Sequence, residues 1–316
     1  MSLRLGFLGT GDFAVPSLQA LHGAGHELAL VVCQPDRPKG RGHQLQAPPL
    51  KLAAQALGLA VAQPERMRSP EALALVQDAR LDLACVVSYG QILPQAVLDA
   101  PRLGCVNVHA SLLPRWRGAA PIEWALAAGD TETGVCVQRM VYKLDAGDVL
   151  LEARRSLGPQ DDAEALHLQL ARLGAGLLVQ AVEGLVAGRL PAKPQDEALA
   201  TLAPLLKKSD GALDPAWLRK HSLDRFKAFR ARPGMWLQLE GGELLKLHAL
   251  SDAGEGPAQS GAVLAVEARG LKLGCGDGAL WAEQVQPPSG KVMPAAAYAR
   301  GHALKPGDRW RKPDLG

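Results

Sequence analysis

The first 190 residues alternate short apolar runs with segments of helical spacing, and this alternation constrains the fold more than any other feature. The apolar runs are "LRLGFLG" at 3–9, "LALVVC" at 28–33, "LACVVSY" at 83–89, "CVNVHA" at 105–110 and "GVCVQRMV" at 134–141. Helical patterns cover 14–24, 48–58, 70–79 and 161–188. Because buried strands alternate with helices, we predict an α/β domain whose mostly parallel sheet is covered on both faces.

The composition changes near residue 190, which predicts a second domain. The segment 188–211 holds three prolines and is typical of a linker. Asp214 and Pro215 are placed to cap and to begin a helix that ends near residue 230. Short strands with the glycine turns "EGGE" and "GDG" follow, which predicts a small antiparallel β-barrel. We expect a catalytic domain at 1–190, a linker at 191–206 and a second domain at 207–316.

Charge and cysteine content indicate the broad class of protein. The formal net charge is +3, divided as −1 over residues 1–190 and +4 over 191–316. The five cysteines form no CxxC pair, which predicts reduced, buried thiols. The chain opens on a strand instead of a charged and then apolar leader, and we see no apolar run close to the roughly 20 residues that span a membrane. We therefore expect a cytoplasmic, soluble protein, and a monomer.

Two polar residues end one of the apolar strands. Asn107 and His109 are two positions apart, so their side chains point to the same side of the strand. They lie at its carboxyl end, and ligands of open parallel sheets bind at that edge. The loop that follows contains Arg115 and Arg117, which can meet an anion. About thirty residues later, "KLDAGDVL" places Asp145 between a strand and a turn at Gly147.

An amide, an imidazole and a carboxylate are suited to acyl transfer without a covalent enzyme intermediate. An amine that attacks a carbonyl places negative charge on the carbonyl oxygen, which Asn107 and a protonated His109 can stabilise. Asp145 can favour the charged imidazole. It can also accept the proton that the amine loses, directly or through water.

Rival interpretations of these residues stay open at this point. A single histidine at a strand end is often structural, whereas a zinc site is disfavoured because Asn is a poor ligand and no HxH or HxxE accompanies it. Ser111 lacks the GxSxG context of a nucleophile. "GTGDFA" at 9–14 resembles a dinucleotide fingerprint without its third glycine, and Asp36 stands near the expected acidic position.

Two basic segments point to a nucleic-acid partner. The Pro- and Gly-rich segment 34–51 carries a net charge of +3, and long loops in compact domains tend to be functional. The run 207–232 holds eight Lys or Arg against three Asp. A barrel of this kind often binds nucleic acids, so we expect the second run to contact phosphates.

The motifs together resemble a known family. "NVHASLLPRWRGAAPI" with "LDAGDV" is similar to the signature of 10-formyltetrahydrofolate-dependent formyltransferases. "GTGDFAVPSLQAL", "QPDRPKGRG", "VVSYGQILP", "QDEALAT" and "AFRARPGMW" narrow the resemblance to the methionyl-tRNA formyltransferases over nearly the whole chain. The departures are small: Gly11 stands where relatives often have Pro, and "RARPG" is richer in Arg.

The resemblance implies a reaction and its residues. The formyl group of 10-formyltetrahydrofolate, the co-substrate, would pass to the α-amine of methionyl initiator tRNA. It implies no metal and no NAD, a Rossmann-like first domain and an OB-like second domain. Asn107, His109 and Asp145 match the catalytic positions. The folate-binding positions are Ser88, Tyr89, Gly90, Gln91, Ile92, Leu93, Ser111, Leu112, Leu113 and Pro114, with a cis bond expected at Leu113–Pro114.

For tRNA binding we select Arg37, Lys39, Arg41, Lys207 and Lys208, and the resemblance implies that the 34–51 loop inserts into the acceptor stem. A formyltransferase that acts on a nucleotide sugar would not need so long a basic arm. A formyl-folate hydrolase would not need the basic second domain. A non-catalytic RNA-binding protein would leave the three polar site residues without a purpose, and an NAD oxidoreductase would need a nicotinamide site.

Overall fold

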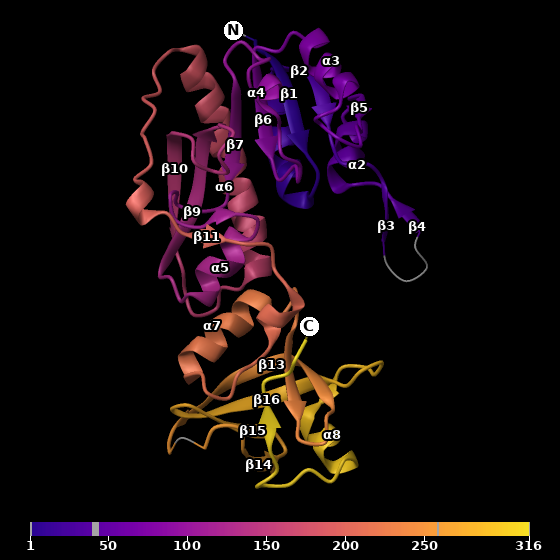
Figure 1. Ribbon diagram of the computed structural model, residues 1–316, viewed down its shortest axis with the longest axis vertical. Coiled ribbons are helices and arrows are strands. Elements are labelled where there is room, and N and C mark those ends of the chain that lie inside the picture. The colour runs from indigo at the N-terminus through magenta and orange to yellow at the C-terminus, as the bar shows by residue number, and fades with distance from the viewer. Residues whose placement is uncertain (1, 40–43, 258, 316) are drawn as a thin grey trace. The chain divides into compact units, whose positions relative to one another are not determined.

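The computed structural model describes residues 2–39, 44–257 and 259–315, and the chain forms two compact units (Figure 1). The first unit contains Met1–Pro121, Glu132–Leu157 and Ala165–Ala203. The second contains Ile122–Thr131, Gly158–Glu164 and Pro204–Gly316. The boundary after Ala203 therefore lies within the segment that we expected to be a linker.

A seven-stranded sheet with the order β10-β9-β7-β6-β1-β2-β5 forms the centre of the first unit. The five strands from β7 to β5 are parallel, and β9 and β10 add an antiparallel edge. The mostly parallel, Rossmann-like sheet is thus confirmed. The strands are β1 Arg4–Gly9, β2 Glu27–Val32, β5 Val61–Ala62, β6 Leu83–Val87, β7 Cys105–His109, β9 Glu132–Arg139 and β10 Val149–Ser156.

Side chains cover both faces of this sheet. On one face, Leu8, Val32 and Val86 pack with residues of α3 and α4 in one hydrophobic cluster. On the other, Gly174 of α6 lies so close to β7 and β9 that an added Cβ would meet Val108 at 2.8 Å. The helices are α1 Val15–Gly23, α2 Pro49–Ala56, α3 Pro70–Asp78, α4 Gln95–Leu98 and α6 Ala163–Val186, and the short 3-10 helix η1 is Asp12–Ala14.

The helix α6 is long and apolar, although the sequence shows no continuous apolar run of this length. Among the described residues, it is the one helix whose length and composition would allow it to cross a membrane. Half of its most apolar stretch is buried inside the protein, as in the core helix of a soluble domain. Because Leu170, Leu178 and Val182 are fully buried, we interpret its apolar face as core.

All five cysteines are free and buried, as the sequence predicted. Burial raises the pKa of Cys33 to about 11 and those of Cys105 and Cys136 to about 12. It also raises the pKa values of Cys85 and Cys275. These thiols therefore act as small apolar side chains and not as nucleophiles.

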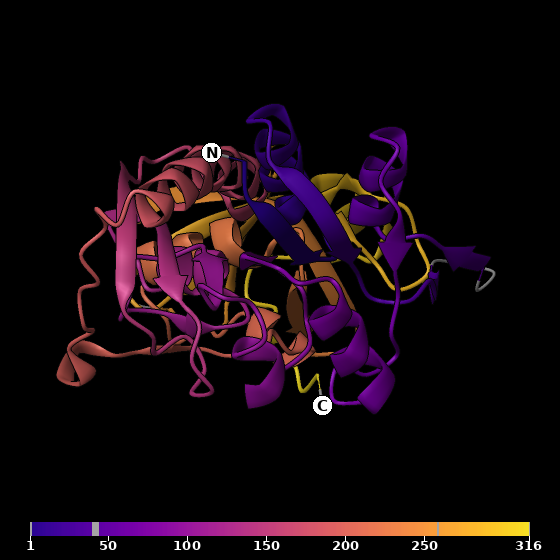
Figure 2. The same cartoon turned by 90° about the horizontal axis from the view of Figure 1, so that it is seen from above.

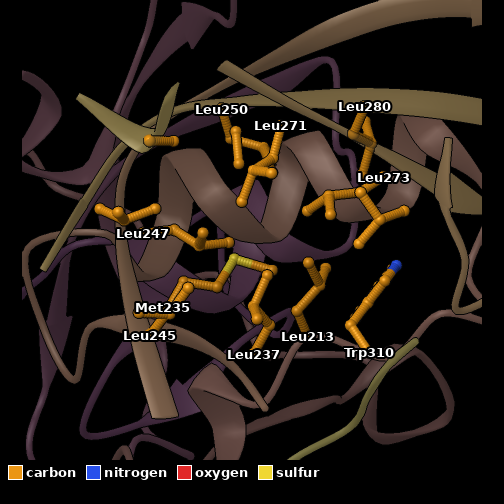
Figure 3. Packing of buried hydrophobic residues seen from close by; sticks show 14 of the residues in the cluster. Leu213, Met235, Leu237, Leu245, Leu247, Leu250, Leu271, Leu273, Leu280 and Trp310 are labelled. Carbon is orange, nitrogen blue, oxygen red and sulfur yellow. The ribbon is translucent and has the colours of Figure 1, made fainter. Parts of the chain in front are cut away.

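The second unit is a curled antiparallel sheet with the order β14-β15-β16-β13-β12-β18. Its two edges meet, since Val263 N donates to Asp308 O and Trp310 N donates to Gly261 O, each at 2.8 Å. Figure 3 shows the leucines and Met235 of its core pointing toward one another. The strands are β12 Met235–Leu239, β13 Leu244–Glu255, β14 Val263–Glu267, β15 Gly270–Cys275, β16 Gly278–Gln286, β17 Met293–Pro294 and β18 Trp310–Arg311.

Three helices accompany this sheet, and one begins later than predicted. They are α5 Pro121–Ala127, most of which belongs to the second unit, α7 Arg219–Phe229 and α8 Ala295–Gly301, with 3-10 helix η3 at Lys208–Gly211. We expected Asp214 to cap α7, but its carboxylate accepts from Ala216 N in a turn, and Leu218 precedes the helix. The prediction failed because Asp stabilises turns as readily as helix N-termini.

The basic segment 34–51 is not a plain loop. The strands β3 Arg37–Lys39 and β4 Gln44–Gln46 pair antiparallel within it. Both views show this hairpin projecting from the sheet of the first unit (Figures 1 and 2). The Arg37 side chain, in its first strand, is exposed.

Candidate active site

Asn107 and His109 share one face of β7, as the period of two requires. Cys105, two residues earlier, packs into the hydrophobic cluster on that face. The amide of Asn107 is half-buried, and His109 is only 6% exposed. The strand thus passes from core to site within five residues.

Protein groups face both nitrogens of the His109 ring. Nε2 lies 2.8 Å from the carbonyl oxygen of Trp116. Since a carbonyl oxygen can only accept, Nε2 carries a hydrogen and donates it. Nδ1 faces Asp145 Oδ2 at 3.7 Å, which is longer than a hydrogen bond. Nδ1 is therefore the nitrogen that faces the carboxylate of the site.

The loop that follows β9 carries Asp145. Because β9 runs antiparallel to β7, its last residues lie beside the beginning of β7, where Met140 N donates to Cys105 O at 2.9 Å. The following loop turns back, and Asp145 has a left-handed backbone with φ of 48°. A non-glycine residue in this region stores backbone strain, which is common at functional sites.

Hydrogen bonds fix the Asp145 carboxylate. Its Oδ2 accepts from Gly118 N and its Oδ1 accepts from Gln138 Nε2, both at 2.9 Å. Gln138 pairs directly with Asn107 across β7 and β9, so one strand pair holds both sides of the site. The side-chain amide of Asn107 has no hydrogen-bond partner among the described residues, so its N–H groups are available to a ligand.

Arg117, which we expected to be able to meet an anion, meets a carboxylate of the chain itself. Arg117 is 4% exposed, and its guanidinium is bound by Gln195 Oε1 and by the Glu197 carboxylate. Hydrogen bonds from Arg117 and then from Lys143 lower the pKa of Glu197 to about 2. Arg117 is thus an internal cation. No local pattern signals this, because its partners lie almost eighty residues away.

The structure places the segment 88–94, expected to bind folate, directly after β6. Tyr89 and Leu93 are buried in the hydrophobic cluster. The amide of Gln91 is also engaged, since its Oε1 accepts from Met67 N at 2.8 Å. Ser88, Gly90 and Ile92 are exposed, and Ile92 has 77% of its surface accessible.

The second expected folate segment, 111–114, follows β7. The Leu113–Pro114 peptide bond is cis, as the resemblance implied. Ser111 and Leu113 are buried, and Ser111 Oγ donates to Arg115 O at 2.6 Å. The hydroxyl hydrogen of Ser111 is therefore already engaged, whereas Leu112 and Pro114 are half-buried.

Exposed apolar side chains occur in the segments that follow β6 and precede Asp145. Tyr142 and Leu144, which precede Asp145, are 70% and 65% exposed, and Ile92 follows the strand next to β7. Such side chains suit a flat, partly apolar co-substrate such as a reduced folate. In the part of the chain that the structure describes, no group of three His, Cys, Asp or Glu side chains is placed to hold a metal ion.

The candidate tRNA contacts of the hairpin are only partly visible. Arg37 pairs with Glu65 at 2.7 Å, and both side chains are more than half exposed. The side chain of Lys39, and residues 40–43 with Arg41, lie outside the described residues. Their role in tRNA binding stays a prediction.

Within the basic run 207–232, most cations already have partners. Arg219 bonds Asp252, Lys220 pairs with Asp224, and Arg230 contacts Asp162. The Arg225 guanidinium lies against aromatic rings, 4.7 Å from the centre of Trp217. Besides Arg225, three members of this run have no carboxylate partner among the described residues. All three are exposed, and they are Lys207, Lys208 and Arg232.

Comparisons with known proteins identify the family. A formyl transferase family model matches residues 3–182, and a formyl transferase C-terminal domain model matches residues 205–303. A methionyl-tRNA formyltransferase of Geobacter sulfurreducens is 42% identical over 97% of this chain and 96% of its own. The chain belongs to the methionyl-tRNA formyltransferase family. Another member, from Neisseria gonorrhoeae, is 44% identical over 96% of this chain and 99% of its own.

Solved structures share the fold at lower identity. HypX of Aquifex aeolicus in complex with tetrahydrofolic acid is 18% identical, with a TM-score of 0.63 over 95% of this chain and 47% of its own. An N-formyltransferase of Helicobacter canadensis, in complex with folinic acid and dTDP-3-aminofucose, is 13% identical, with a TM-score of 0.65 over 89% and 98% of the two chains. At these identities the likeness concerns the fold.

Proposed function

We propose that this protein transfers the formyl group of 10-formyltetrahydrofolate to the α-amine of methionyl initiator tRNA. The observation that carries the proposal is the convergence of His109 Nδ1 and Asp145 Oδ2 at 3.7 Å, beside an Asn107 amide that no described residue bonds. The full-length likeness to methionyl-tRNA formyltransferases supports the same reaction.

The proposed mechanism is a direct attack. The lone pair of the methionine amine forms a bond to the formyl carbon, and the carbonyl electron pair moves to its oxygen. Asn107 and the N–H at His109 Nδ1 stabilise that oxygen by donating hydrogen bonds. Asp145 receives the proton that the amine releases. The oxygen electron pair then re-forms the carbonyl as the C–N10 bond breaks, N10 takes up the proton that the amine released, and tetrahydrofolate and the formylated methionyl-tRNA leave.

The remaining assignments follow from this reaction. We propose that the segments 88–94 and 111–114, with Ile92 accessible, hold the folate. Arg37, Lys39, Arg41, Lys207 and Lys208 are proposed to contact tRNA phosphates, since exposed cations supply most of the affinity for nucleic-acid backbones. We further propose a soluble, cytoplasmic monomer.

A formylation assay tests the proposal directly. The protein is incubated with 10-formyltetrahydrofolate and one of three acceptors: initiator tRNA charged with methionine, elongator tRNA charged with methionine, or free methionine. We expect rapid formylation of the charged initiator alone. Equal transfer to free methionine, or hydrolysis of the folate with no acceptor product, would contradict the proposal.

The lysines at the start of the second unit give a separate prediction. We expect the double variant Lys207→Ala/Lys208→Ala to weaken tRNA binding and to lower the slope of log K against log salt by about 1–2, because each phosphate contact contributes roughly 0.9. Binding is measured by filter retention at several salt concentrations.

Lys220 provides the matched control. It is exposed as well, but it is neutralised by Asp224 at 2.6 Å, so Lys220→Ala should change the slope much less. If Lys220→Ala lowered the slope as much as Lys207→Ala/Lys208→Ala does, the assignment of Lys207 and Lys208 would be rejected.

A further inference from the structure

We propose that Gln195 is a positioning residue for formyl transfer, which holds the turn of Asp145 at the distance that His109 requires. This inference rests on the proposed roles of His109 and Asp145. Gln195 lies in the segment that we expected to be a linker, and its hydrogen bonds connect that segment to the site.

Both ends of the Gln195 side-chain amide are hydrogen-bonded. Its Oε1 accepts from Arg117 Nε at 3.0 Å and from Nη2 at 2.8 Å. Its Nε2 donates to the carbonyl oxygens of Asp145 at 2.9 Å and of Gly147 at 2.6 Å. Guanidinium only donates and carbonyls only accept, so the partners fix which end of the amide is oxygen. A residue without both a donor and an acceptor cannot make this set of bonds.

The two groups that Gln195 joins belong to the two loops of the site. Arg117 stands between Trp116, whose carbonyl accepts from His109, and Gly118, whose amide donates to Asp145. The other group is the Asp145 turn itself. One amide therefore links the loop that holds the imidazole to the turn that carries the carboxylate.

The chain around Gln195 is anchored on the same loop. The strand β11, Leu202–Ala203, pairs in parallel with β8, Arg117–Gly118. Thr201 Oγ1 accepts from Trp116 N at 2.9 Å. The segment that carries Gln195 is thus fixed to the first unit by backbone pairing, independently of its side chain, and a substitution at Gln195 leaves that pairing intact.

The strained backbone of Asp145 makes this support necessary. A left-handed φ of 48° at a non-glycine residue is strained and persists only where neighbouring contacts determine it. Gln195 supplies two of these contacts to the turn, and Gln138 supplies a third to the carboxylate. Without Gln195 the turn can relax, and the Asp145 carboxylate moves relative to Nδ1.

The test is a comparison of transfer rates in the full chain. We expect Gln195→Ala to lower kcat about 10- to 100-fold, since a displacement near 1 Å can cost that much. The KM for either substrate should stay within about threefold. Gln195→Glu keeps the acceptor for Arg117 but faces two carbonyls with a carboxylate, so it should lose as much rate. If the alanine variant does not fold, the glutamate variant decides.

A double-variant cycle separates positioning from general structural support. If Gln195 acts through Asp145, Gln195→Ala/Asp145→Ala transfers within about twofold of Asp145→Ala alone. Gln169 is the control, because it also bonds an arginine, Arg155 at 2.7 Å, but is exposed, so Gln169→Ala should behave like the parent.

Each outcome has a distinct meaning. Losses that multiply in the double variant, a rise in KM with kcat retained, or a parent rate for Gln195→Ala would each overturn the inference. A parent rate for Asp145→Ala would instead reject the proposed catalytic assignment.

Discussion

Replacing His109 by alanine should lower the rate of formyl transfer about 10²- to 10⁴-fold, the usual contribution of a positioned proton donor or oxyanion stabiliser. The affinity for tRNA should stay within a few fold, because a side chain that is 6% exposed adds little to a phosphate-binding surface. Single-turnover transfer at saturating substrates measures the first quantity, and filter binding measures the second.

Asp145→Ala should lose transfer to a similar extent, because the carboxylate that faces Nδ1 is removed. His167 offers a matched control in the same unit. Its Nε2 pairs with Asp12 at 3.0 Å, a closer contact than that of His109, but it lies outside the proposed site. His167→Ala should therefore transfer at the parent rate. If His109→Ala and Asp145→Ala lost tRNA binding as much as they lost transfer, these residues would be structural.

Gly147→Ala should both destabilise the first unit and suppress transfer. A Cβ on Gly147 would collide with the carbonyl oxygen of Arg139, so the backbone must move. We expect a loss of about 1–3 kcal/mol in the free energy of unfolding, as for other overpacked sites. The shift also displaces the turn that carries Asp145, which lowers kcat. Chemical denaturation and the formylation assay measure the two effects.

Gly176 in α6 is the control for this substitution. Apart from the adjacent residues and the helix's own backbone, no described atom lies within 4 Å of the position that a Cβ would take there, so alanine fits without a clash. Alanine also has the higher helix propensity, and Gly176→Ala should raise stability by about 0.4–1 kcal/mol. Unchanged stability and rate in Gly147→Ala would show that the turn tolerates movement and would weaken the role given to its geometry.

Local pattern predicted much of this site. Asn107 and His109 stand out because a strand that only builds core has no need of polar side chains at its end, and a period of two puts both on one face. The helices at 49–56 and 70–78 were predicted from the helical patterns at 48–58 and 70–79. Such features depend on neighbours within a few residues.

Long-range contacts could not be predicted in this way. Arg117 was expected to be able to meet an anion, but the sequence did not indicate that its partners would be Gln195 and Glu197, 78 and 80 residues later. A composition rich in proline and polar residues is typical of a linker, and it does not indicate that the segment pairs with β8. The antiparallel direction of β9 could likewise not be predicted, because the apolar pattern of a strand is the same whether it runs parallel or antiparallel to its neighbour.

The sequence by itself determined the alternating α/β pattern, the second β domain and the residue types of the site, since these depend on local spacing and side-chain chemistry. Only the tertiary structure decided which polar groups are available. It buried Arg117, left the Asn107 amide without a partner in the described chain and held Asp145 in a left-handed turn beside His109. The physical reason is that a hydrogen bond between distant segments depends on how the chain folds back, and no local pattern encodes that partner.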